Sequence, residues 1–165
     1  MRILKLNLGK IMIDKLSSDD LNAYFELMCN EYIAKYCGFT PVESKDKAKM
    51  LLDSDIADDT VAIRNSDSNK LIGLINLFEN IGANNEPLST ELDLGYLIQD
   101  EYSHKGYMTL ALSKVIELLK CKSRVEKIFA TFKKENIGSM KVLKNNGFAK
   151  CASDSETETW VLNLK

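Results

Sequence analysis

The chain has 165 residues, of which 45% are hydrophobic and 28% charged, and its net charge is −2 at neutral pH. These values are ordinary for a soluble globular protein, and the length is most simply that of one domain, residues 1–165. Charges of both signs are interspersed, with no run of five like charges. This pattern argues against an extended nucleic-acid footprint and a polybasic membrane patch, so we predict neither partner.

The cysteines and the histidine restrict the chemistry further. Cys29, Cys37, Cys121 and Cys151 form no CxxC pair, so we predict buried small hydrophobes in a reducing compartment. His104 is the single histidine, which removes most metal sites and catalytic triads. We therefore predict no metal.

The N-terminal segment does not resemble a targeting signal. Its apolar residues are interrupted by Lys5, Asn7 and Lys10, and it lacks a small-residue cleavage site. The longest apolar window, LIGLINLF at 71–78, is too short to span a bilayer. These features predict a cytoplasmic protein.

The first predicted elements are a ribbon and a helix. Apolar and polar residues alternate through 2–16, as in a strand or a two-strand ribbon broken at Gly9. A helix is predicted over about 18–30, because Ser17 and Asp20 have the spacing of a capping box. The inward face of this helix carries Leu21, Tyr24, Phe25 and Met28.

The next segment, 33–41, is predicted to be an irregular connection ended by Gly38 and Pro41. A second helix follows over about 44–53, and its apolar side carries Ala48, Leu51 and Leu52. We expect these helices and their connector to lie over one end of the sheet, where substrate pockets are often built from loops.

The middle of the chain predicts three strands. Segments 60–65 and 70–79 flank a polar turn of hairpin length and are expected to pair antiparallel. A polar loop over 80–89 leads to a strand at 90–98. One face of that strand carries Leu92, Leu94, Tyr96 and Ile98, and the other carries Glu91, Asp93, Gly95 and Leu97.

The last third predicts a helix over about 104–120 and a strand at 125–132, parallel to 90–98 through a right-handed crossover. A helix over about 136–145 ends at Asn146 and Gly147, and an antiparallel hairpin closes the chain. The inward face of the 104–120 helix carries Leu110, Leu112, Val115, Ile116 and Leu119.

The turn between strand 90–98 and the next helix is the strongest indication of function. In SHKGYM at 103–108, Gly106 is expected in the first helical turn, where four backbone N–H groups lack intrahelical partners and suit a phosphate. The alternative is that the glycine only relieves a crowded backbone. The absence of a Gly-x-x-x-x-Gly-Lys-Ser/Thr pattern argues against a general nucleotide-phosphate binder.

The element order and two local motifs resemble the GNAT superfamily of acetyl-CoA-dependent N-acetyltransferases, and most closely its RimJ/RimL-like branch. The motifs are LDLGYLIQDEYSHKGYMTLAL and NIGSMKVLKNNGF, and the resemblance covers nearly the whole chain. It implies an α/β (α+β) fold: a mixed, mostly antiparallel sheet of six to seven strands with a central, splayed parallel pair and about four helices.

The same resemblance implies acetyl-CoA as co-substrate, with its diphosphate on the 103–108 turn and its pantetheine arm between the parted strands. In this turn only Gly106 matches the family pattern fully, because Ser103 replaces Gln or Arg and Met108 replaces a small residue. The implied cofactor-binding residues are Tyr96, Leu97, Ile98, Ser103, His104, Lys105, Gly106, Tyr107, Met108 and Asn136.

Three residues are implied catalysts. Ser139 would protonate the departing thiolate, or it only supports the start of its helix. Glu91 or Asp93 would accept the proton of the amine, directly or through water, or both are solvated carboxylates on an exposed strand face. Asn136 is a pantetheine ligand, a helix N-cap, or both.

The predicted function is transfer of an acetyl group from acetyl-CoA to a primary amine, either a protein N-terminus or a small molecule, in a ternary complex. The alternative is a CoA-binding sensor or interaction domain that keeps the fold without turnover. Family members often form a homodimer. The acidic helix start at 17–20, together with Glu31, indicates a cationic acceptor.

Overall fold

The structure, a computed structural model, describes residues 4–122 and 124–165. The chain forms two compact units. One contains the described residues up to Asn76 together with Tyr96–Tyr107, and we call it the N-terminal unit. The other contains Leu77–Gly95 and Met108–Lys165, and we call it the C-terminal unit. The prediction that residues 1–165 form a single domain stays a prediction.

Within the described residues the fold is mixed α/β, with an eight-stranded, mostly antiparallel sheet and five α-helices, one strand and one helix more than predicted. The strands follow the order β1-β2-β3-β4-β5-β6-β8-β7. They are β1 Leu6–Asn7, β2 Ile11–Lys15, β3 Val61–Asn65, β4 Leu71–Ile81, β5 Pro87–Ile98, β6 Lys127–Lys133, β7 Ala149–Ser153 and β8 Thr157–Asn163. The helices are α1 Leu21–Met28, α2 Glu31–Cys37, α3 Lys45–Ala57, α4 Tyr107–Lys122 and α5 Ile137–Asn145, with 3-10 turns η1 Ser18–Asp20 and η2 Asp100–Tyr102.

The N-terminal unit begins with the predicted ribbon. β1 and β2 pair antiparallel around Gly9, whose φ of +93° lies in the left-handed region that glycine tolerates without a steric penalty. Residues 2 and 3 of the predicted ribbon lie outside the described part. β2 pairs antiparallel with β3, and β3 with β4, as the predicted hairpin requires.

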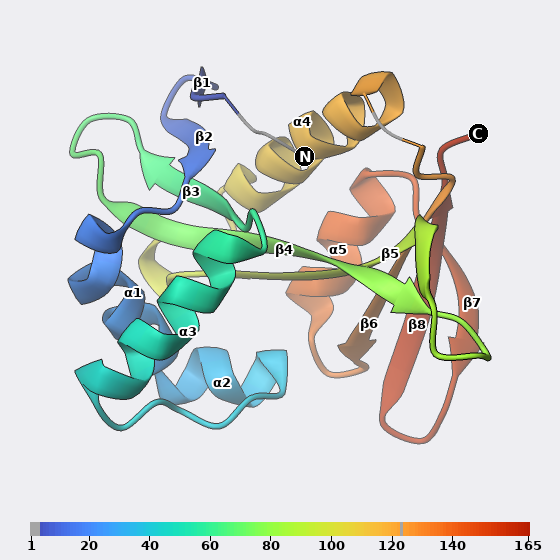
Figure 1. Ribbon diagram of the computed structural model, residues 1–165, viewed down its shortest axis with the longest axis horizontal. Coiled ribbons are helices and arrows are strands. Elements are labelled where there is room, and N and C mark those ends of the chain that lie inside the picture. Colours follow the sequence, from blue (N-terminus) through green and yellow to red (C-terminus); the bar gives the residue numbers. More distant parts are fainter. Residues whose placement is uncertain (1–3, 123) are drawn as a thin grey trace. The chain divides into compact units, whose positions relative to one another are not determined.

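Helices α1 and α3 lie side by side in this unit (Figure 1). The predicted capping box is present, because the Ser17 side chain accepts from the backbone of the first turn and Asp20 accepts from the Ser17 N–H. The core of the unit consists of Leu16, Tyr24, Leu27, Ile33, Val42, Ala48, Leu52, Ala62, Leu71 and Leu74. The predicted inward residue Leu51 is instead 42% exposed.

The irregular connection predicted over 33–41 is wrong, because α2 occupies most of it. The Asn30 side chain caps this helix by accepting from the Ile33 N–H at 3.0 Å. Gly38 ends it in the left-handed conformation, with φ +78°. Both residues are ordinary helix-end signals, and the helix between them is only seven residues long.

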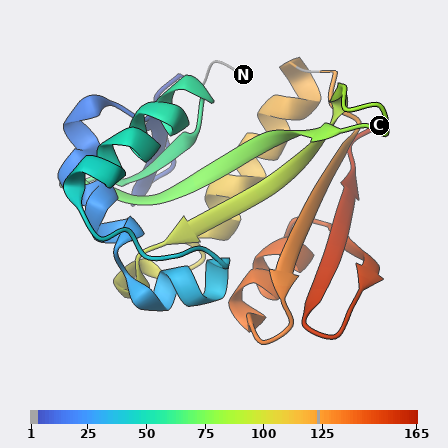
Figure 2. The same cartoon turned by 60° about the horizontal axis from the view of Figure 1, so that its bottom comes forward.

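The C-terminal unit contains β5 up to Gly95 and β6, which pair parallel (Figure 2). β6 and β7 both pair antiparallel with β8, as the predicted final hairpin requires. The connection before β5 is shorter than predicted, since β4 extends to Ile81 and β5 begins at Pro87. α5 packs against β6 and ends at Asn145, as expected.

Helix α4 begins at Tyr107, so Gly106 precedes the helix instead of lying in its first turn. Leu112, Val115, Ile116 and Leu119 are buried as predicted. Leu110 is 43% exposed, contrary to the expected inward face.

The prediction that the cysteines are buried is also wrong. Cys29, Cys37, Cys121 and Cys151 are all exposed and all are free thiols. Their burial depends on which helix and strand faces are covered, which spacing along the chain does not reveal. In the described part of the chain, no helix has the length and apolar character needed to cross a membrane.

Candidate functional site

The turn that follows β5 in the N-terminal unit is built by short-range hydrogen bonds. The Tyr102 N–H donates to the Gln99 carbonyl and the Ser103 N–H donates to the Asp100 carbonyl, both at 3.0 Å. The Ser103 hydroxyl donates to the same Asp100 carbonyl at 2.7 Å. The side-chain donor of Ser103 is therefore used within the turn, and it does not replace the longer side chain found in the family pattern.

Two left-handed residues shape the rest of this turn. His104 has φ +56° and Gly106 has φ +79°. A Cβ placed on Gly106 would meet nothing within 4 Å, so the backbone is open at this point. The first N–H groups of α4, beginning at Tyr107, have no intrahelical acceptor. An open backbone next to a helix start fits an incoming anion.

A cation and two aromatic rings accompany this turn. Lys105 Nζ lies 5.7 Å from the Tyr102 ring centroid, and the Tyr102 and Tyr107 rings are 6.5 Å apart. Lys105 is exposed, which leaves its charge available to a phosphate. The Met108 side chain, in the C-terminal unit, is only 5% exposed and is part of the buried interior. Only the Met108 backbone remains a candidate for contact with a ligand.

The predicted pantetheine-contacting residues, Tyr96, Leu97 and Ile98, form the end of β5. The Gln99 N–H that follows them donates to the Ile72 carbonyl at 2.9 Å. The Cys37 thiol at the end of α2 donates to the Tyr96 carbonyl at 3.7 Å. These contacts place α2 directly beside the end of β5 within the N-terminal unit, a neighbour that the sequence analysis missed.

In the C-terminal unit, the parallel register of β5 and β6 is short. It joins Glu91 to Lys127 and continues only as far as Asp93 and Phe129. Beyond this point β6 remains paired with β8, up to Lys133 and Thr157. The parallel pairing thus joins the middle of β5 to the beginning of β6.

Glu91 and Asp93 follow one another on the same face of β5 but differ in their surroundings. Lys127 Nζ lies 3.6 Å from Glu91 Oε1, so this carboxylate already has a cationic partner. Partial burial of its carboxyl group, together with the charge of Glu91, raises the pKa of Asp93. Asp93 thus holds its proton to higher pH than an ordinary aspartate, while Glu91 already has a cationic partner.

Asn136 and Ser139 lie together at the start of α5. Asn136 Oδ1 accepts from the Ser139 N–H at 3.1 Å, so Asn136 is the N-cap of this helix. This contact uses the side-chain oxygen and leaves the Asn136 amide nitrogen as a donor for another group. Both residues are half-buried.

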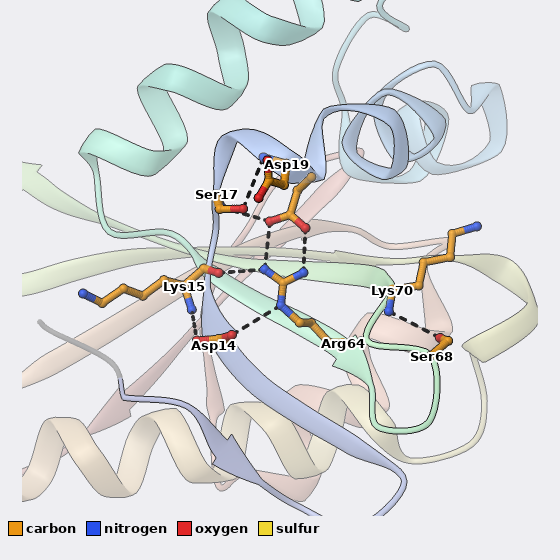
Figure 3. Close-up of polar contacts among 8 residues, drawn as sticks. Asp14, Lys15, Ser17, Asp19, Arg64, Ser68 and Lys70 are labelled. Carbon is orange, nitrogen blue, oxygen red and sulfur yellow. Dashed lines mark hydrogen bonds and ion pairs between the residues drawn. The ribbon is translucent and has the colours of Figure 1, made fainter.

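The acidic helix start that indicated a cationic acceptor has another role. Arg64 forms a two-pronged ion pair with Asp20, and both side chains are buried. Figure 3 shows the Arg64 guanidinium group also close to Asp14 and to the backbone of Lys15. Asp20 therefore belongs to the interior of the N-terminal unit. Among the described residues, no group of three or more His, Cys, Asp or Glu side chains could hold a metal ion.

The protein-family model described as "Acetyltransferase (GNAT) domain" matches residues 10–149 of the chain. The chain belongs to the GNAT acetyltransferase family. No curated protein matches this GNAT chain significantly. Apart from one additional strand and one additional helix, its element order is the predicted one.

Solved structures share the fold over nearly the full length of this GNAT protein. A GNAT-family acetyltransferase from Bacillus anthracis is 16% identical, with coverage of 98% and 99% of the two chains and a TM-score of 0.82. Spermidine N-acetyltransferase from Vibrio cholerae, in complex with CoA and spermine, is 18% identical, with coverage of 94% and 96% and a TM-score of 0.78. The RimL ribosomal L7/L12 alpha-N-protein acetyltransferase in complex with coenzyme A is 13% identical, with coverage of 97% and 98% and a TM-score of 0.82.

Proposed function

We propose that this GNAT protein transfers the acetyl group of acetyl-CoA to a primary amine by direct attack in a ternary complex. The observation that carries the proposal is the open turn at His104–Gly106, which leads into the free N–H groups of α4 within a matched GNAT domain. Two of the solved structures with this fold contain CoA, which supports the choice of co-substrate.

The co-substrate would be held by backbone groups at its diphosphate. The amides around Gly106 and at the start of α4 would donate to phosphate oxygens, and Lys105 would add positive charge. Tyr96, Leu97, Ile98 and the free amide nitrogen of Asn136 would bind the pantetheine arm. His104, Ser103 and Tyr107 would shape the turn.

The amine must lose a proton before or during attack on the thioester. We assign the base to Asp93, acting directly or through water, because its pKa is raised and because Glu91 is already paired with Lys127. Glu91 would then act on Asp93 through its negative charge. Holding the two reactants together provides a large part of the rate enhancement in such a transfer.

The departing thiolate needs a proton or a hydrogen bond. The Ser139 hydroxyl is the assigned donor, and its backbone N–H is held by Asn136. This bond fixes the first turn of α5 and thereby the direction from which Ser139 acts. With no covalent acetyl-enzyme, none of the four cysteines has a catalytic role.

The acceptor belongs to the primary amines. Spermidine N-acetyltransferase acts on a small polyamine, and the RimL enzyme acts on the alpha-amino group of a ribosomal protein. These two proteins share the fold of this chain. Their acceptors define the two classes of acceptor to be compared for it: small amines and protein N-termini. A cytoplasmic location and a homodimer remain predictions.

Two measurements test the proposal. Thermal unfolding with acetyl-CoA, CoA or ATP shows which ligand binds the folded chain, because such a ligand raises the midpoint of unfolding. We expect a shift with acetyl-CoA and CoA and none with ATP. Thiol release from acetyl-CoA in the presence of a panel of amines then tests turnover.

The alternative is a CoA-binding sensor without turnover, and the same pair of measurements separates the two functions. A shift with acetyl-CoA without thiol release for any amine would support the sensor. No shift with either CoA species would contradict both functions.

A further inference from the structure

A glycine inside β4 lets the end of β5 come unusually close within the N-terminal unit. A Cβ atom placed on Gly73 would lie 2.7 Å from the Leu97 carbonyl oxygen and 3.4 Å from the Cα and Cβ atoms of Ile98. The first distance is too short for an ordinary contact, so no side chain fits here unless the backbone moves. Gly73 is not in the left-handed conformation. Glycine is therefore needed at this position for space, because another backbone approaches closely.

The β4 strand is also irregular at this point. Its register with β3 shifts by one position, so that Ile72 is an extra residue on β4. The carbonyl of Ile72 accepts from the Gln99 N–H at 2.9 Å. Such a β-bulge bends its strand and changes the direction in which the strand presents its groups. The bulge at Ile72 and the missing side chain of Gly73 thus both act on the end of β5.

β4 is the rigid side of this contact. The β4 residues on both sides of Gly73 are almost completely buried, namely Leu71, Ile72, Leu74 and Ile75. The last residues of β5 are only half-buried. A methyl group added to Gly73 would therefore displace the Leu97–Ile98 backbone, by roughly 1 Å, more readily than it would displace β4.

The segment that would move has a role in the proposed function. It belongs to Tyr96–Ile98, which would bind the pantetheine arm of the co-substrate. Hydrogen bonds weaken steeply when donor and acceptor leave their optimal distance. The diphosphate would be held separately by the turn at Gly106, so a displaced Leu97–Ile98 backbone would lose the pantetheine arm without affecting the diphosphate contacts.

We propose that Gly73, together with the bulge at Ile72, positions the Leu97–Ile98 backbone so that it can hydrogen-bond the pantetheine arm of acetyl-CoA. This inference rests on the proposed acetyl transfer. Gly73 is a positioning residue, because it acts through Leu97 and Ile98 and does not itself touch the ligand. A glycine within a strand is otherwise less favourable than alanine, which is consistent with a need for space at this point.

The test compares the two halves of the co-substrate on the full chain. CoA carries the pantetheine arm, whereas its fragment 3′-phospho-ADP carries only the nucleotide and the diphosphate. Isothermal titration calorimetry measures the Kd of both ligands. We expect Gly73→Ala to raise the Kd of CoA about tenfold and to change the Kd of the fragment by less than about twofold. A variant that was only less stable would not distinguish CoA from its fragment.

Gly9→Ala is the matched control. It adds the same methyl group to another glycine of the N-terminal unit, where a Cβ atom would meet nothing within 4 Å. Both Kd values should stay close to those of the wild type. Thiol release gives a second measurement, in which the KM for acetyl-CoA should rise about tenfold in Gly73→Ala only.

A second pair of variants acts through the Ile72 carbonyl. Gln99 has φ −59°, which proline adopts without strain, and Gln99→Pro removes the N–H that donates to Ile72. Gln99→Ala removes the side chain and keeps this N–H. We expect Gln99→Pro to raise the Kd of CoA about threefold or more relative to Gln99→Ala, with equal Kd values for the fragment. This pair decides the question if Gly73→Ala does not fold.

The outcomes separate this inference from the proposed function. Weaker binding of CoA alone in Gly73→Ala, with Gly9→Ala unaffected, supports the positioning role. If the wild type binds CoA but Gly73→Ala weakens both ligands equally or neither of them, the positioning role is overturned and acetyl transfer stands. Without a folded Gly73→Ala variant, equal CoA binding by the two Gln99 variants overturns it. If the wild type does not bind CoA, the proposed function fails and this inference fails with it.

Discussion

Arg64 holds Asp20 with both ends of its guanidinium group. Arg64 Nη1 lies 2.6 Å from Asp20 Oδ1, and Nη2 lies 2.8 Å from Oδ2. Nη2 also donates to the Lys15 carbonyl at 2.8 Å, while Nε lies 3.5 Å from a carboxylate oxygen of Asp14. This buried pair joins the start of α1 to β3, across 44 positions of sequence.

Removing one member of this pair should destabilise the protein strongly. Arg64→Met leaves the Asp20 carboxylate buried without its cation, and we expect a loss of about 3 kcal/mol or more in the free energy of unfolding. Chemical denaturation measures this value. Lys49→Met, which removes one member of the exposed Lys49–Asp53 pair, should cost less than about 1 kcal/mol. Equal costs for the two variants would contradict the structural role of Arg64.

Asp55 should make stability depend on pH in the opposite sense to most carboxylates. Its carboxylate accepts from Tyr24 at 2.7 Å and from Asn76 at 3.2 Å, and burial raises its pKa above the ordinary value near 3.8. A raised pKa in the folded state favours folding at low pH, and this contribution is lost as pH rises through the folded-state pKa.

The stability of Asp55→Asn relative to the wild type should therefore increase between pH 4 and pH 7. Denaturation curves at several pH values measure the difference. Asp53→Asn, on the exposed side of the same helix, is the matched control. If the stability difference between Asp55→Asn and the wild type stays constant over this pH range, the raised pKa of Asp55 is refuted.

Gly106 should tolerate asparagine better than valine. Its φ of +79° is accessible to asparagine but strained for a β-branched residue. We expect Gly106→Val to abolish the thermal shift caused by acetyl-CoA, with most of the fold retained, while Gly106→Asn keeps part of the shift. Gly9→Val introduces similar strain at φ +93° in the N-terminal ribbon and should leave the shift intact. An unchanged shift in Gly106→Val would remove the phosphate role of this turn.

Ser139→Ala should reduce turnover more than it weakens binding of acetyl-CoA. The Ser139 N–H still donates to Asn136 in this variant, so the helix start is preserved. Loss of a proton donor to the leaving group is expected to lower kcat by roughly 100-fold. Steady-state kinetics and the acetyl-CoA thermal shift measure the two effects. If kcat is unchanged, Ser139 only supports the helix start.

The Asp93 assignment predicts opposite movements of the pH–rate profile. Asp93→Asn should lower kcat/KM by roughly 100-fold, because the base is lost. Glu91→Gln removes a negative neighbour, lowers the pKa of Asp93 and moves the acidic limb to lower pH. Lys127→Met removes the cation that partners Glu91, so the negative charge of Glu91 acts more strongly on Asp93. The pKa of Asp93 then rises, and the acidic limb moves to higher pH. A limb that does not move in either variant would assign the base to another group.

Features set by neighbours in the chain were predictable from the sequence. The capping box at Ser17, the hairpins and the stop at Gly147 all depend on hydrogen bonds or backbone angles within a few residues. The motif at 136–148, which pointed to the family, is local in the same way, because its residues form the start and the end of one helix. α2 was missed although Asn30 and Gly38 mark its ends, because the helix between them is short.

The sequence by itself determined most of the order of the elements, the fold class and the position of the turn before α4, since local periodicity and glycine conformations encode them. Only the tertiary structure decided which charged groups are already paired. Asp20 has the same carboxylate as Asp93, yet Arg64 holds one in the interior while the other is exposed on β5. Such pairing depends on residues distant in the chain, whose approach follows from how whole helices and strands pack.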